Sequence, residues 1–344
     1  MSARDETIAD ALLQWYDRHA RVLPWRSLPS EPPPDPYRVW LSEVMLQQTT
    51  VAAVKPYFLR FTRRWPTVEA LATAREEEVM AAWAGLGYYS RARNLVKAAR
   101  EVARLGAFPK TEAELRELPG LGAYTAAAVA AIAFGERAVV VDANVERVVA
   151  RLFAIAEPLP GARKAIRAAA ERITPDARAG DFAQAMMDLG ATICTPRVPK
   201  CLLCPLRERC SSYASGVSEN YPVKHARRAA PERSGRAYWV ERDQNVWLVT
   251  RPATTMLGGM RALPDDGWTA QADGSGKPPL PGEWEMVGEV RHGFTHAKLA
   301  LAVLAYRGDT ILSGTGEWWP VELLEEAGLP TLFAKAAKLA LKAR

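Results

Sequence analysis

The sequence has few cysteines, no long apolar run and, over its first two-thirds, almost no strand-like pattern. Its four cysteines all lie between Cys194 and Cys210 of a 344-residue chain, which argues against the disulfide framework of small secreted domains. No apolar run approaches the roughly 20 residues that span a bilayer. The first ten residues, MSARDETIAD, are charged where a secretory signal is apolar. We therefore expect a cytoplasmic protein without a membrane partner.

Positive charge is unevenly distributed along the chain. Residues 1–228 hold 32 Lys and Arg against 25 Asp and Glu, whereas residues 229–344 hold 13 against 14. The net charge of +6 therefore comes from the first two-thirds. A basic region fits a polyanion-binding surface, and on charge alone it fits an ordinary solvated face equally well.

The first two-thirds have a helical pattern. Up to about Ala214, apolar residues recur every three or four positions between Pro and Gly punctuation. Asp35 and Pro36 predict one helix start, AYTAAAVAAIAF predicts a helix from Ala123 to about Phe134, and Asp142 predicts another start. We expect a mainly α region over residues 1–214.

The composition changes after the cysteines. Residues 215–235 are polar and contain prolines, which predicts a linker. Beyond it, AYWVERDQNVWLVTR predicts two strands joined by an Asp-Gln-Asn turn, AKLALAVLAYR predicts a later strand, and a helical stretch begins at Leu332. We expect a separate α+β domain over residues 236–344.

The cysteine spacing is C-x6-C-x2-C-x5-C. Zinc modules usually present two C-x2-C pairs, whereas one such pair flanked by single cysteines fits a loop around an iron–sulfur cluster. The spacing favours a 4Fe-4S cluster and leaves zinc as the alternative. The expected ligands are Cys194, Cys201, Cys204 and Cys210.

Together with the glycine-hinged stretch LPGLGAYT, this cysteine loop resembles the endonuclease III superfamily of DNA glycosylases. The resemblance implies a helix-hairpin-helix at about 115–134, an iron–sulfur loop at 194–210 and double-stranded DNA as partner. Gly120 and Gly122 would bring backbone N–H groups at a helix start against a phosphate. A simple turn between two helices would need the same glycines.

Tyr124 follows the hairpin glycines. In superfamily members that also cut the strand, a lysine at the matching position attacks the sugar, which a phenol cannot do. The resemblance therefore implies a monofunctional glycosylase that leaves an abasic site. Without the resemblance, Tyr124 reads as an ordinary partly buried aromatic.

Two carboxylates could divide the work of breaking a base–sugar bond. Glu43 lies in the apolar stretch VWLSEVML, where burial would raise its pKa as a general acid requires. The segment WLSEVMLQQT resembles the adenine-specific MutY family, which implies that Glu43 protonates the departing adenine. Asp142 reads as a helix cap from its position alone. The resemblance implies that it stabilises the sugar cation, with Asn144 orienting the reacting groups.

Other site residues rest on the same resemblance. It implies that Tyr88 and Gln48 contact DNA at the lesion, with Arg91 nearby, and that Arg26 and Gln184 line the adenine pocket. The C-terminal third resembles the Nudix-like domain of the MutY family, which reads 8-oxoguanine. The residues expected to do so are Phe294, Thr295 and His296, and Thr295 stands where many relatives carry serine.

The Nudix likeness raises a rival activity, nucleotide hydrolysis. ELLEEAGL imitates the end of a Nudix box, but the positions that need Arg, Glu and Gly hold Val321, Ser313 and Arg307. We therefore expect a surface helix there and a recognition role for the domain.

The sequence predicts a monomeric, monofunctional adenine DNA glycosylase that acts on adenine opposite 8-oxoguanine or guanine in base excision repair, near the nucleoid. One alternative is a thymine glycosylase for G·T mismatches, which can also carry tyrosine in the hairpin. Another is a non-catalytic iron–sulfur protein that binds DNA.

Overall fold

The computed structural model describes residues 3–225, 230–252, 255–294, 296–308 and 314–343. Its contacts divide the chain into two compact units. The helical unit comprises Met1–Thr73 and Asn94–Ala226, and the sheet unit comprises Ala74–Arg93 and Arg227–Arg344. The segment Ala74–Arg93 groups with the C-terminal part, which no local sequence pattern indicated.

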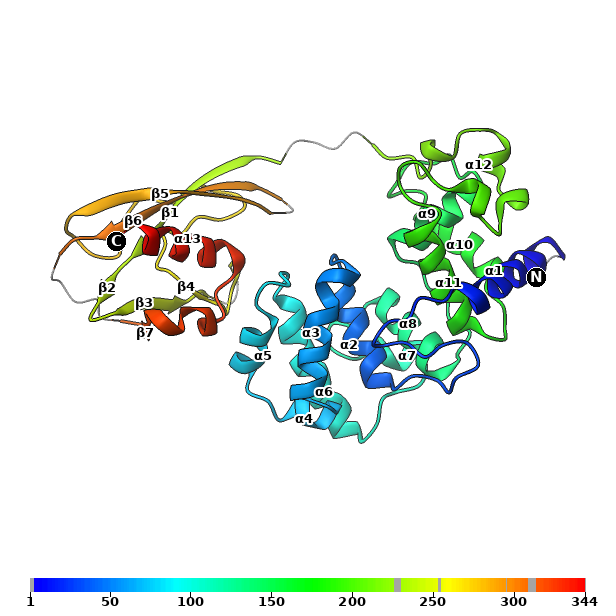
Figure 1. Cartoon of the computed structure of the whole chain (residues 1–344), viewed down its shortest axis with the longest axis horizontal. Coiled ribbons are helices and arrows are strands. Elements are labelled where there is room, and N and C mark those ends of the chain that lie inside the picture. The colour runs from blue at the N-terminus through cyan, green and yellow to red at the C-terminus, as the bar shows by residue number, and fades with distance from the viewer. Residues whose placement is uncertain (1–2, 226–229, 253–254, 295, 309–313, 344) are drawn as a thin grey trace. The chain divides into compact units, whose positions relative to one another are not determined.

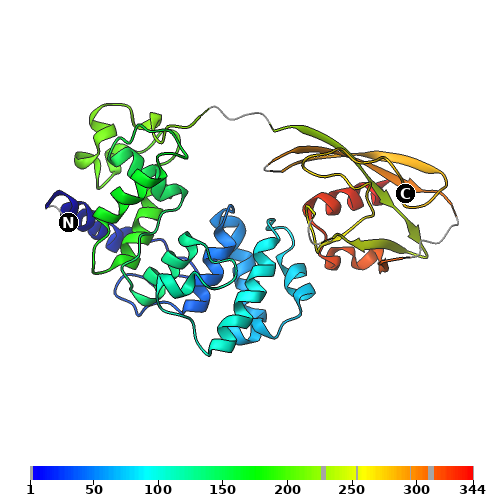
Figure 2. The same cartoon turned by 180° about the vertical axis from the view of Figure 1, so that it is seen from behind.

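The helical unit is built from helices joined by short loops (Figures 1 and 2). Its α-helices are α1 (Ala3–His19), α2 (Pro36–Leu46), α3 (Val51–Arg64), α4 (Val68–Ala72), α6 (Ser90–Leu105), α7 (Glu112–Leu115), α8 (Ala123–Phe134), α9 (Ala143–Leu152), α10 (Arg163–Ile173), α11 (Ala179–Thr192) and α12 (Ser211–Ala214). Short 3-10 turns are η1 (Cys201–Leu203), η2 (Arg207–Arg209) and η3 (Ser218–Asn220). No helix in the described part of the chain is long and apolar enough to cross a membrane.

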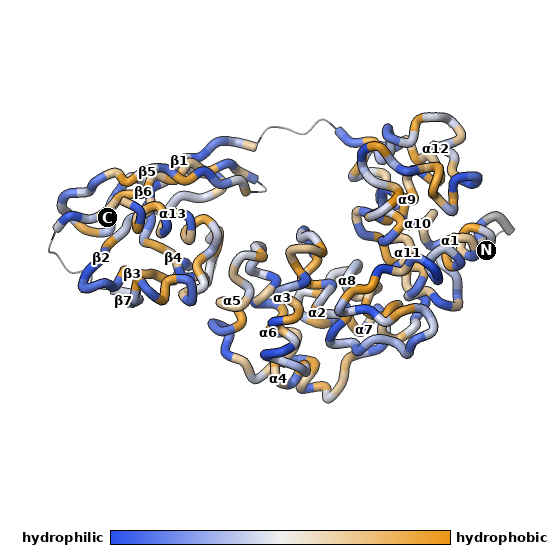
Figure 3. Tube along the Cα trace, in the orientation of Figure 1, coloured by the Kyte–Doolittle hydropathy of each residue, from blue (hydrophilic) through white to orange (hydrophobic). Residues whose placement is uncertain are grey.

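Helix α8 is the centre of this unit. Its residues from Thr125 to Ala133 are all buried, because an alanine-rich helix with apolar residues on every side can be surrounded by other helices. It contacts α2 and α7 on one side and α11 on the other. Gly180 in α11 allows the close approach, since a Cβ there would lie 2.4 Å from the carbonyl oxygen of Ala131. Outer helices such as α6 instead alternate hydrophilic and hydrophobic stretches (Figure 3).

The predicted helix starts are confirmed. Asp35 caps α2 by accepting a hydrogen bond from the backbone N–H of Tyr37 at 2.8 Å, and Pro36 occupies the first turn. Helix α8 ends at Gly135, whose φ of 72° lies in the left-handed region that favours glycine. These local signals fix where the helices that carry the site begin and end.

In its described part, the sheet unit contains two small sheets and three helical segments. Its elements are α5 (Glu76–Trp83), β1 (Glu232–Trp239), β2 (Glu241–Arg242), β3 (Asn245–Thr250), β4 (Arg261–Ala262), β5 (Trp284–Gly293), β6 (Lys298–Tyr306), β7 (Gly316–Pro320), η4 (Val321–Ala327) and α13 (Thr331–Lys342). One sheet has the order β1-β6-β5, and in the other β3 pairs with β2, β4 and β7. Helix α13 packs against β5, β6 and β1, and Trp268 and Phe333 lie in the core between them (Figure 1).

Two expectations for this region need correction. The linker is shorter than 215–235, because the backbone N–H of Leu159 bonds to the carbonyl of Val223 and β1 already begins at Glu232. The expected hairpin pairs only Glu241–Arg242 with β3, around a turn at Asp243 and Gln244. The residues before it, in β1, run parallel to β6 in the other sheet, a long-range pairing that alternation cannot reveal.

The remaining C-terminal elements match the expectations. Strand β6 and helix α13 lie where the sequence predicted a strand and a helical stretch. The segment ELLEEAGL forms the 3-10 helix η4, which buries Leu324 and Ala327 and leaves its glutamates outward. The fold class, a mainly α region followed by an α+β domain, is confirmed.

Candidate active site

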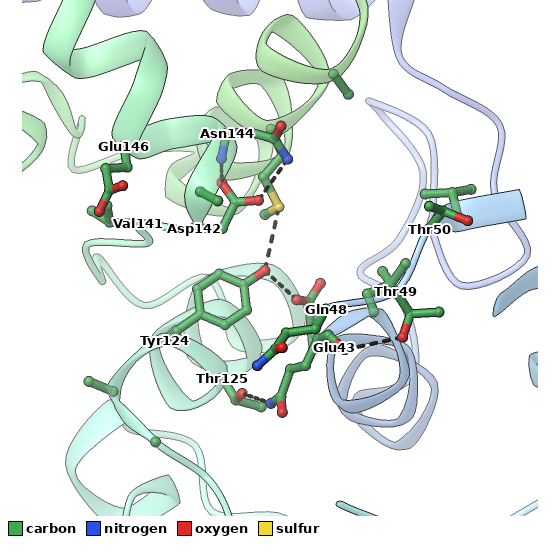
Figure 4. Close-up of a pocket in the computed structure, with 18 of the residues that line it drawn as sticks. Glu43, Gln48, Thr49, Thr50, Tyr124, Thr125, Val141, Asp142, Asn144 and Glu146 are labelled. Atoms are coloured by element: carbon green, nitrogen blue, oxygen red, sulfur yellow. Dashed lines mark hydrogen bonds between the residues drawn. The ribbon is translucent and has the colours of Figure 1, made fainter. Parts of the chain in front are cut away.

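A cleft of about 1230 Å³ opens in the helical unit. The end of α2 and the start of α8 form one wall, and α9, α10 and α11 contribute the other. Glu43, Tyr124 and Asp142 come from three different elements, and their side chains extend toward a common space (Figure 4). The sequence-predicted catalytic residues are therefore brought together in one cavity.

Glu43 is the buried carboxyl of the cleft, with 5% of its surface exposed. Its helix, α2, buries Val39, Trp40, Val44 and Met45 around it, as the apolar stretch predicted. Burial raises the pKa of Glu43 from 4.5 to about 7, and a hydrogen bond from Tyr124 and the charge of Arg26 oppose that rise. A carboxyl with a pKa near 7 holds its proton for much of the time at neutral pH, as a general acid must.

Tyr124 is oriented by Glu43. Its hydroxyl donates to Oε2 of Glu43 at 2.6 Å and lies 3.7 Å from the sulfur of Met187 (Figure 4). The pKa of Tyr124 is raised well above 10, first by burial and then by the charges of Glu43 and Asp142. Tyr124 therefore stays a neutral hydrogen-bond donor and offers the cleft neither an amine nor a phenolate.

Asp142 is the N-cap of α9. Its carboxylate accepts hydrogen bonds from the backbone N–H groups of Asn144 and Val145 at 2.8 and 2.7 Å, and from the side-chain amide of Asn144 at 2.9 Å (Figure 4). A helix N-terminus favours negative charge, and the three donors hold the carboxylate in place. The same hydrogen bonds therefore cap α9 and hold the carboxylate of Asp142 in place for its proposed catalytic role.

Asn144 is itself held by Arg147, a residue that sequence reasoning missed. The guanidinium of Arg147 donates to the side-chain oxygen of Asn144 at 2.9 Å and to the carbonyls of Gly190 and Cys194 at 2.8 and 2.7 Å. The same side chain thus ties the segment beside Asp142 to the start of the cysteine loop.

The hairpin glycines have different roles. Gly120 has a φ of 80°, and a Cβ there would lie 2.6 Å from Asn94 Cβ, so backbone and packing both require glycine. Gly122 has an ordinary φ of −77°, caps α8 without a side chain and leaves open space around its Cα. An exposed Gln48, whose φ of 55° is unusual for a residue with a side chain, also lines the cleft. The open helix start can approach a phosphate closely.

Of the two expected adenine-pocket residues, one lines the cleft. Arg26 lines it, and its guanidinium donates to Oδ2 of Asp188 at 2.7 Å. Gln184 does not belong to the described lining; it is 5% exposed on α11, and Met187, one turn further along, lines the cleft instead. Gln184 and Met187 are three residues apart on the same face of α11, so the difference is one of position along the helix, which sequence alone does not specify.

Tyr88 and Arg91 both lie in the segment Ala74–Arg93, which groups with the sheet unit. Tyr88 is 45% exposed with a φ of 48°, in a loop where Gly85 and Gly87 also have positive φ. Arg91 is only 8% exposed, and its guanidinium donates to the carbonyls of Leu86 and Gly87. Arg91 thus fixes the loop that presents Tyr88, and its expected contact with DNA stays a prediction.

Two residues of the predicted lesion-recognition triplet, Phe294 and His296, lie between β5 and β6. Phe294 is half-buried and stacks on Trp268, with ring centroids 5.8 Å apart, and His296 is exposed. Thr295 lies outside the described residues. The ring of Phe294 thus contributes to the core of the sheet unit.

The four cysteines share one small cavity. Cys194, Cys201, Cys204 and Cys210 line a mostly apolar space of about 30 Å³ together with Arg151. Arg151 donates to the sulfur of Cys194 at 3.4 Å and to the carbonyls of Thr195 and Pro196. Among the described residues, no group of three His, Cys, Asp or Glu is arranged to hold a single metal ion.

Asp188 is the second functional residue that sequence reasoning missed. It is fully buried on α11, where it accepts hydrogen bonds from Arg21 and Arg26. The signal that singled out Glu43, a lone carboxylate within an apolar helix, is also present in FAQAMMDLG and could have found it.

Comparison with known families agrees with this geometry. Residues 41–175 match the family model described as HhH-GPD superfamily base excision DNA repair protein, and residues 236–339 match a NUDIX domain. The first range contains Glu43, Tyr124 and Asp142. The fold and the cleft therefore define a DNA glycosylase of the helix-hairpin-helix superfamily.

Individual relatives narrow this class. The adenine DNA glycosylase of Homo sapiens is 36% identical over 96% of this chain and 73% of its own, and that of Mus musculus is 35% identical over 95% and 76%. The chain belongs to the adenine DNA glycosylase family. Among solved structures, a thermostable thymine-DNA glycosylase is 32% identical with a TM-score of 0.55, covering 62% of this chain and 97% of its own. Endonuclease III in a non-covalent DNA complex, at 24% identity and a TM-score of 0.52 over 63% of this chain and 99% of its own, shares the fold.

Proposed function

We propose that this enzyme removes adenine paired with 8-oxoguanine or guanine and leaves the DNA strand intact. The observation that carries the proposal is the pairing in one cleft of a buried carboxyl, Glu43, whose pKa is raised to about 7, with a capped carboxylate, Asp142. The first suits proton donation and the second suits stabilisation of a cation.

The reaction proceeds on this chain's residues in two stages. Glu43 delivers its proton to a ring nitrogen of the flipped adenine, so that the electrons of the base–sugar bond leave with a neutral base. Asp142, fixed by Asn144, faces the positive charge that develops on the sugar. A water then adds its hydroxyl to the sugar carbon and returns its proton to Glu43, which restores the enzyme.

Tyr124 supports the monofunctional assignment. It occupies the hairpin position at the cleft, donates to Glu43 and has no amine that could form a Schiff base with the sugar. Hydrolysis therefore ends at an abasic site.

We propose that the four cysteines hold a 4Fe-4S cluster. Their spacing and their shared cavity fit such a cluster, which when bound supplies a rigid scaffold for the loop. Arg197, Lys200, Arg207 and Arg209, which alternate with the ligands, supply positive charge for DNA phosphates. Analysis of purified protein for about four irons and four sulfides per chain, with zinc as the alternative result, tests this.

We further propose that the sheet unit reads 8-oxoguanine, with Phe294, Thr295 and His296 contributing. The match of the human relative over 96% of this chain, which includes this unit, supports the proposal. Tyr88 and Gln48 would fill the gap left by the flipped adenine. We expect a monomer located in the cytoplasm at the nucleoid, which size-exclusion chromatography and microscopy of a tagged protein test.

One assay tests the function. Purified protein is incubated with duplexes containing A opposite 8-oxoguanine, A opposite G, and T opposite G, and base release is measured with and without alkali. The proposal expects adenine release, fastest opposite 8-oxoguanine, with strand cleavage only after alkali. Thymine release would favour the relationship to the thymine-DNA glycosylase, and cleavage without alkali would overturn the monofunctional assignment.

A further inference from the structure

Behind the cleft lies a buried carboxylate that the reaction scheme does not use. Asp188 has 0% of its surface exposed, yet it belongs to α11, whose Met187 lines the cleft. Burying an ionised carboxylate costs several kcal/mol unless charged partners satisfy it, so its partners identify its role.

Both charged partners come from the loop after α1. The Nε and backbone N–H of Arg21 donate to Asp188 at 2.6 and 3.2 Å, and Nη1 of Arg26 donates at 2.7 Å. Both arginines line the cleft, whereas Asp188 does not belong to the described lining. The carboxylate therefore binds the two guanidinium groups from behind.

The position of Arg26 matters for the reacting groups. Its side chain is 7% exposed, and its charge lowers the pKa of both Glu43 and Tyr124, so it lies electrostatically close to both. An arginine has several rotatable bonds, and a side chain without a fixed partner would sample several positions. The hydrogen bond to Asp188 restricts the guanidinium of Arg26, which lines the cleft, to one geometry.

We infer that Asp188 is a positioning residue for base excision, which orients the guanidinium of Arg26 toward the flipped base. The inference rests on the proposed function and deepens it. The ligand of Arg26 is a purine, whose ring nitrogens accept hydrogen bonds in the plane of the base. Asp188 itself touches neither base nor sugar and acts through Arg26.

A double-mutant cycle tests this route. Single-turnover rates of base release are measured for wild type, Asp188→Asn, Arg26→Ala and the double variant, on the base that the wild type releases. We expect Asp188→Asn to lower the rate roughly 10- to 100-fold, because small misplacements of a positioning group carry losses of this size. The double variant should be no slower than Arg26→Ala alone.

A second readout separates positioning from a structural role. The dissociation constant for a duplex with a non-hydrolysable adenine analogue should change less than about threefold in Asp188→Asn, because the phosphate contacts that dominate DNA affinity remain. Asp181→Asn is the matched control. It removes a carboxylate from the same helix that pairs with the partly exposed Arg178, and it should leave the rate within about twofold.

Several results would overturn the inference. A wild-type rate in Asp188→Asn, or additive losses in the double variant, would show that Asp188 does not act through Arg26. If Asp188→Asn does not fold, the Arg26→Ala variant tests the inference. A wild-type rate of base release in Arg26→Ala would show that Asp188 cannot act on the reaction through Arg26. Absence of adenine release by the wild type contradicts the proposed function instead, and the cycle is then read on the base that it does release.

Discussion

The end of α2 and the start of α9 both present a carboxyl group to the same cleft, and they do so in opposite ways. Glu43 lies within a helix among apolar side chains, and burial raises its pKa to about 7. Asp142 lies at a helix start, where three N–H donors hold its carboxylate. One wall of the cleft favours a protonated carboxyl, and the other provides the hydrogen bonds and helix dipole that suit a charged one.

The two chemical roles, general acid and stabilising anion, are therefore set by the secondary structure around each carboxyl group. The interior of an apolar helix withholds water and donors from a carboxyl, whereas a helix N-terminus supplies donors. The assignment of acid and stabilising anion follows from these environments without reference to the substrate.

The largest effect is expected when the general acid, Glu43, loses its proton-donating group. Glu43→Gln keeps the shape of the side chain and its acceptor for Tyr124 but has no proton to donate, so the rate of base release should fall about 10³- to 10⁴-fold. Single-turnover kinetics on an A·8-oxoguanine duplex measure it, with duplex affinity as the control. A loss below tenfold would mean that the base leaves without protonation by Glu43.

The second largest effect is expected when the negative charge of Asp142 is removed. Asp142→Asn should lower the rate about 10²- to 10³-fold, because the negative charge facing the sugar is lost. Asparagine caps helices as well as aspartate, so the thermal midpoint should change little. Rate and melting temperature measured together separate the charge from the cap. A large fall in melting temperature would mean that the geometry around α9 collapsed, and the rate would then say nothing about charge.

A third prediction concerns stability. Because the folded-state pKa of Glu43 lies above its unfolded value of 4.5, its favourable contribution is present below pH 4.5 and is lost as pH rises to about 7. Glu43→Gln escapes this loss, so above pH 8 it should be more stable than wild type by about 2–3 kcal/mol, with little difference near pH 4.5. Urea unfolding of wild type and Glu43→Gln at the two pH values measures it, and an equal difference in stability at both pH values would contradict the raised pKa of Glu43.

The sequence predicts the helix starts that line the cleft better than it predicts how the helices pack against one another. The starts of α2, α8 and α9 were predictable, because Asp35, the hairpin glycines and Asp142 are local signals. The burial of Glu43 followed from its apolar neighbours in the chain. The catalytic grouping itself was supplied by the family resemblance, since nothing local brings positions 43, 124 and 142 together.

The errors arose where tertiary packing decides. Arg91 was expected to contact DNA on the family resemblance alone, and its burial by loop carbonyls and the ring of Trp83 could not be read from the chain. The partners of Asp188 depend on how α11 packs against the loop after α1, which a helical pattern leaves open, and the adenine contact expected of Gln184 stays a prediction. Strand β1 pairs with β6, nearly 60 residues away, and no alternation pattern encodes that choice.

The smallest effect is expected when the Tyr124 hydroxyl, which donates to Glu43, is removed. The hydrogen bond from Tyr124 lowers the pKa of Glu43, so Tyr124→Phe should raise that pKa above 7 and move the alkaline fall of the rate to higher pH. The rate at pH 7 should fall only about 5- to 10-fold, which corresponds to about 1–1.4 kcal/mol, the net size of one ordinary hydrogen bond. A pH–rate profile under single turnover separates the two effects. If the alkaline fall of the rate moved to lower pH instead, Tyr124 would be stabilising the protonated form of Glu43. That result would contradict a hydroxyl that donates to the Glu43 carboxylate, and with it the opposition between burial and hydrogen bonding that sets the pKa of the acid.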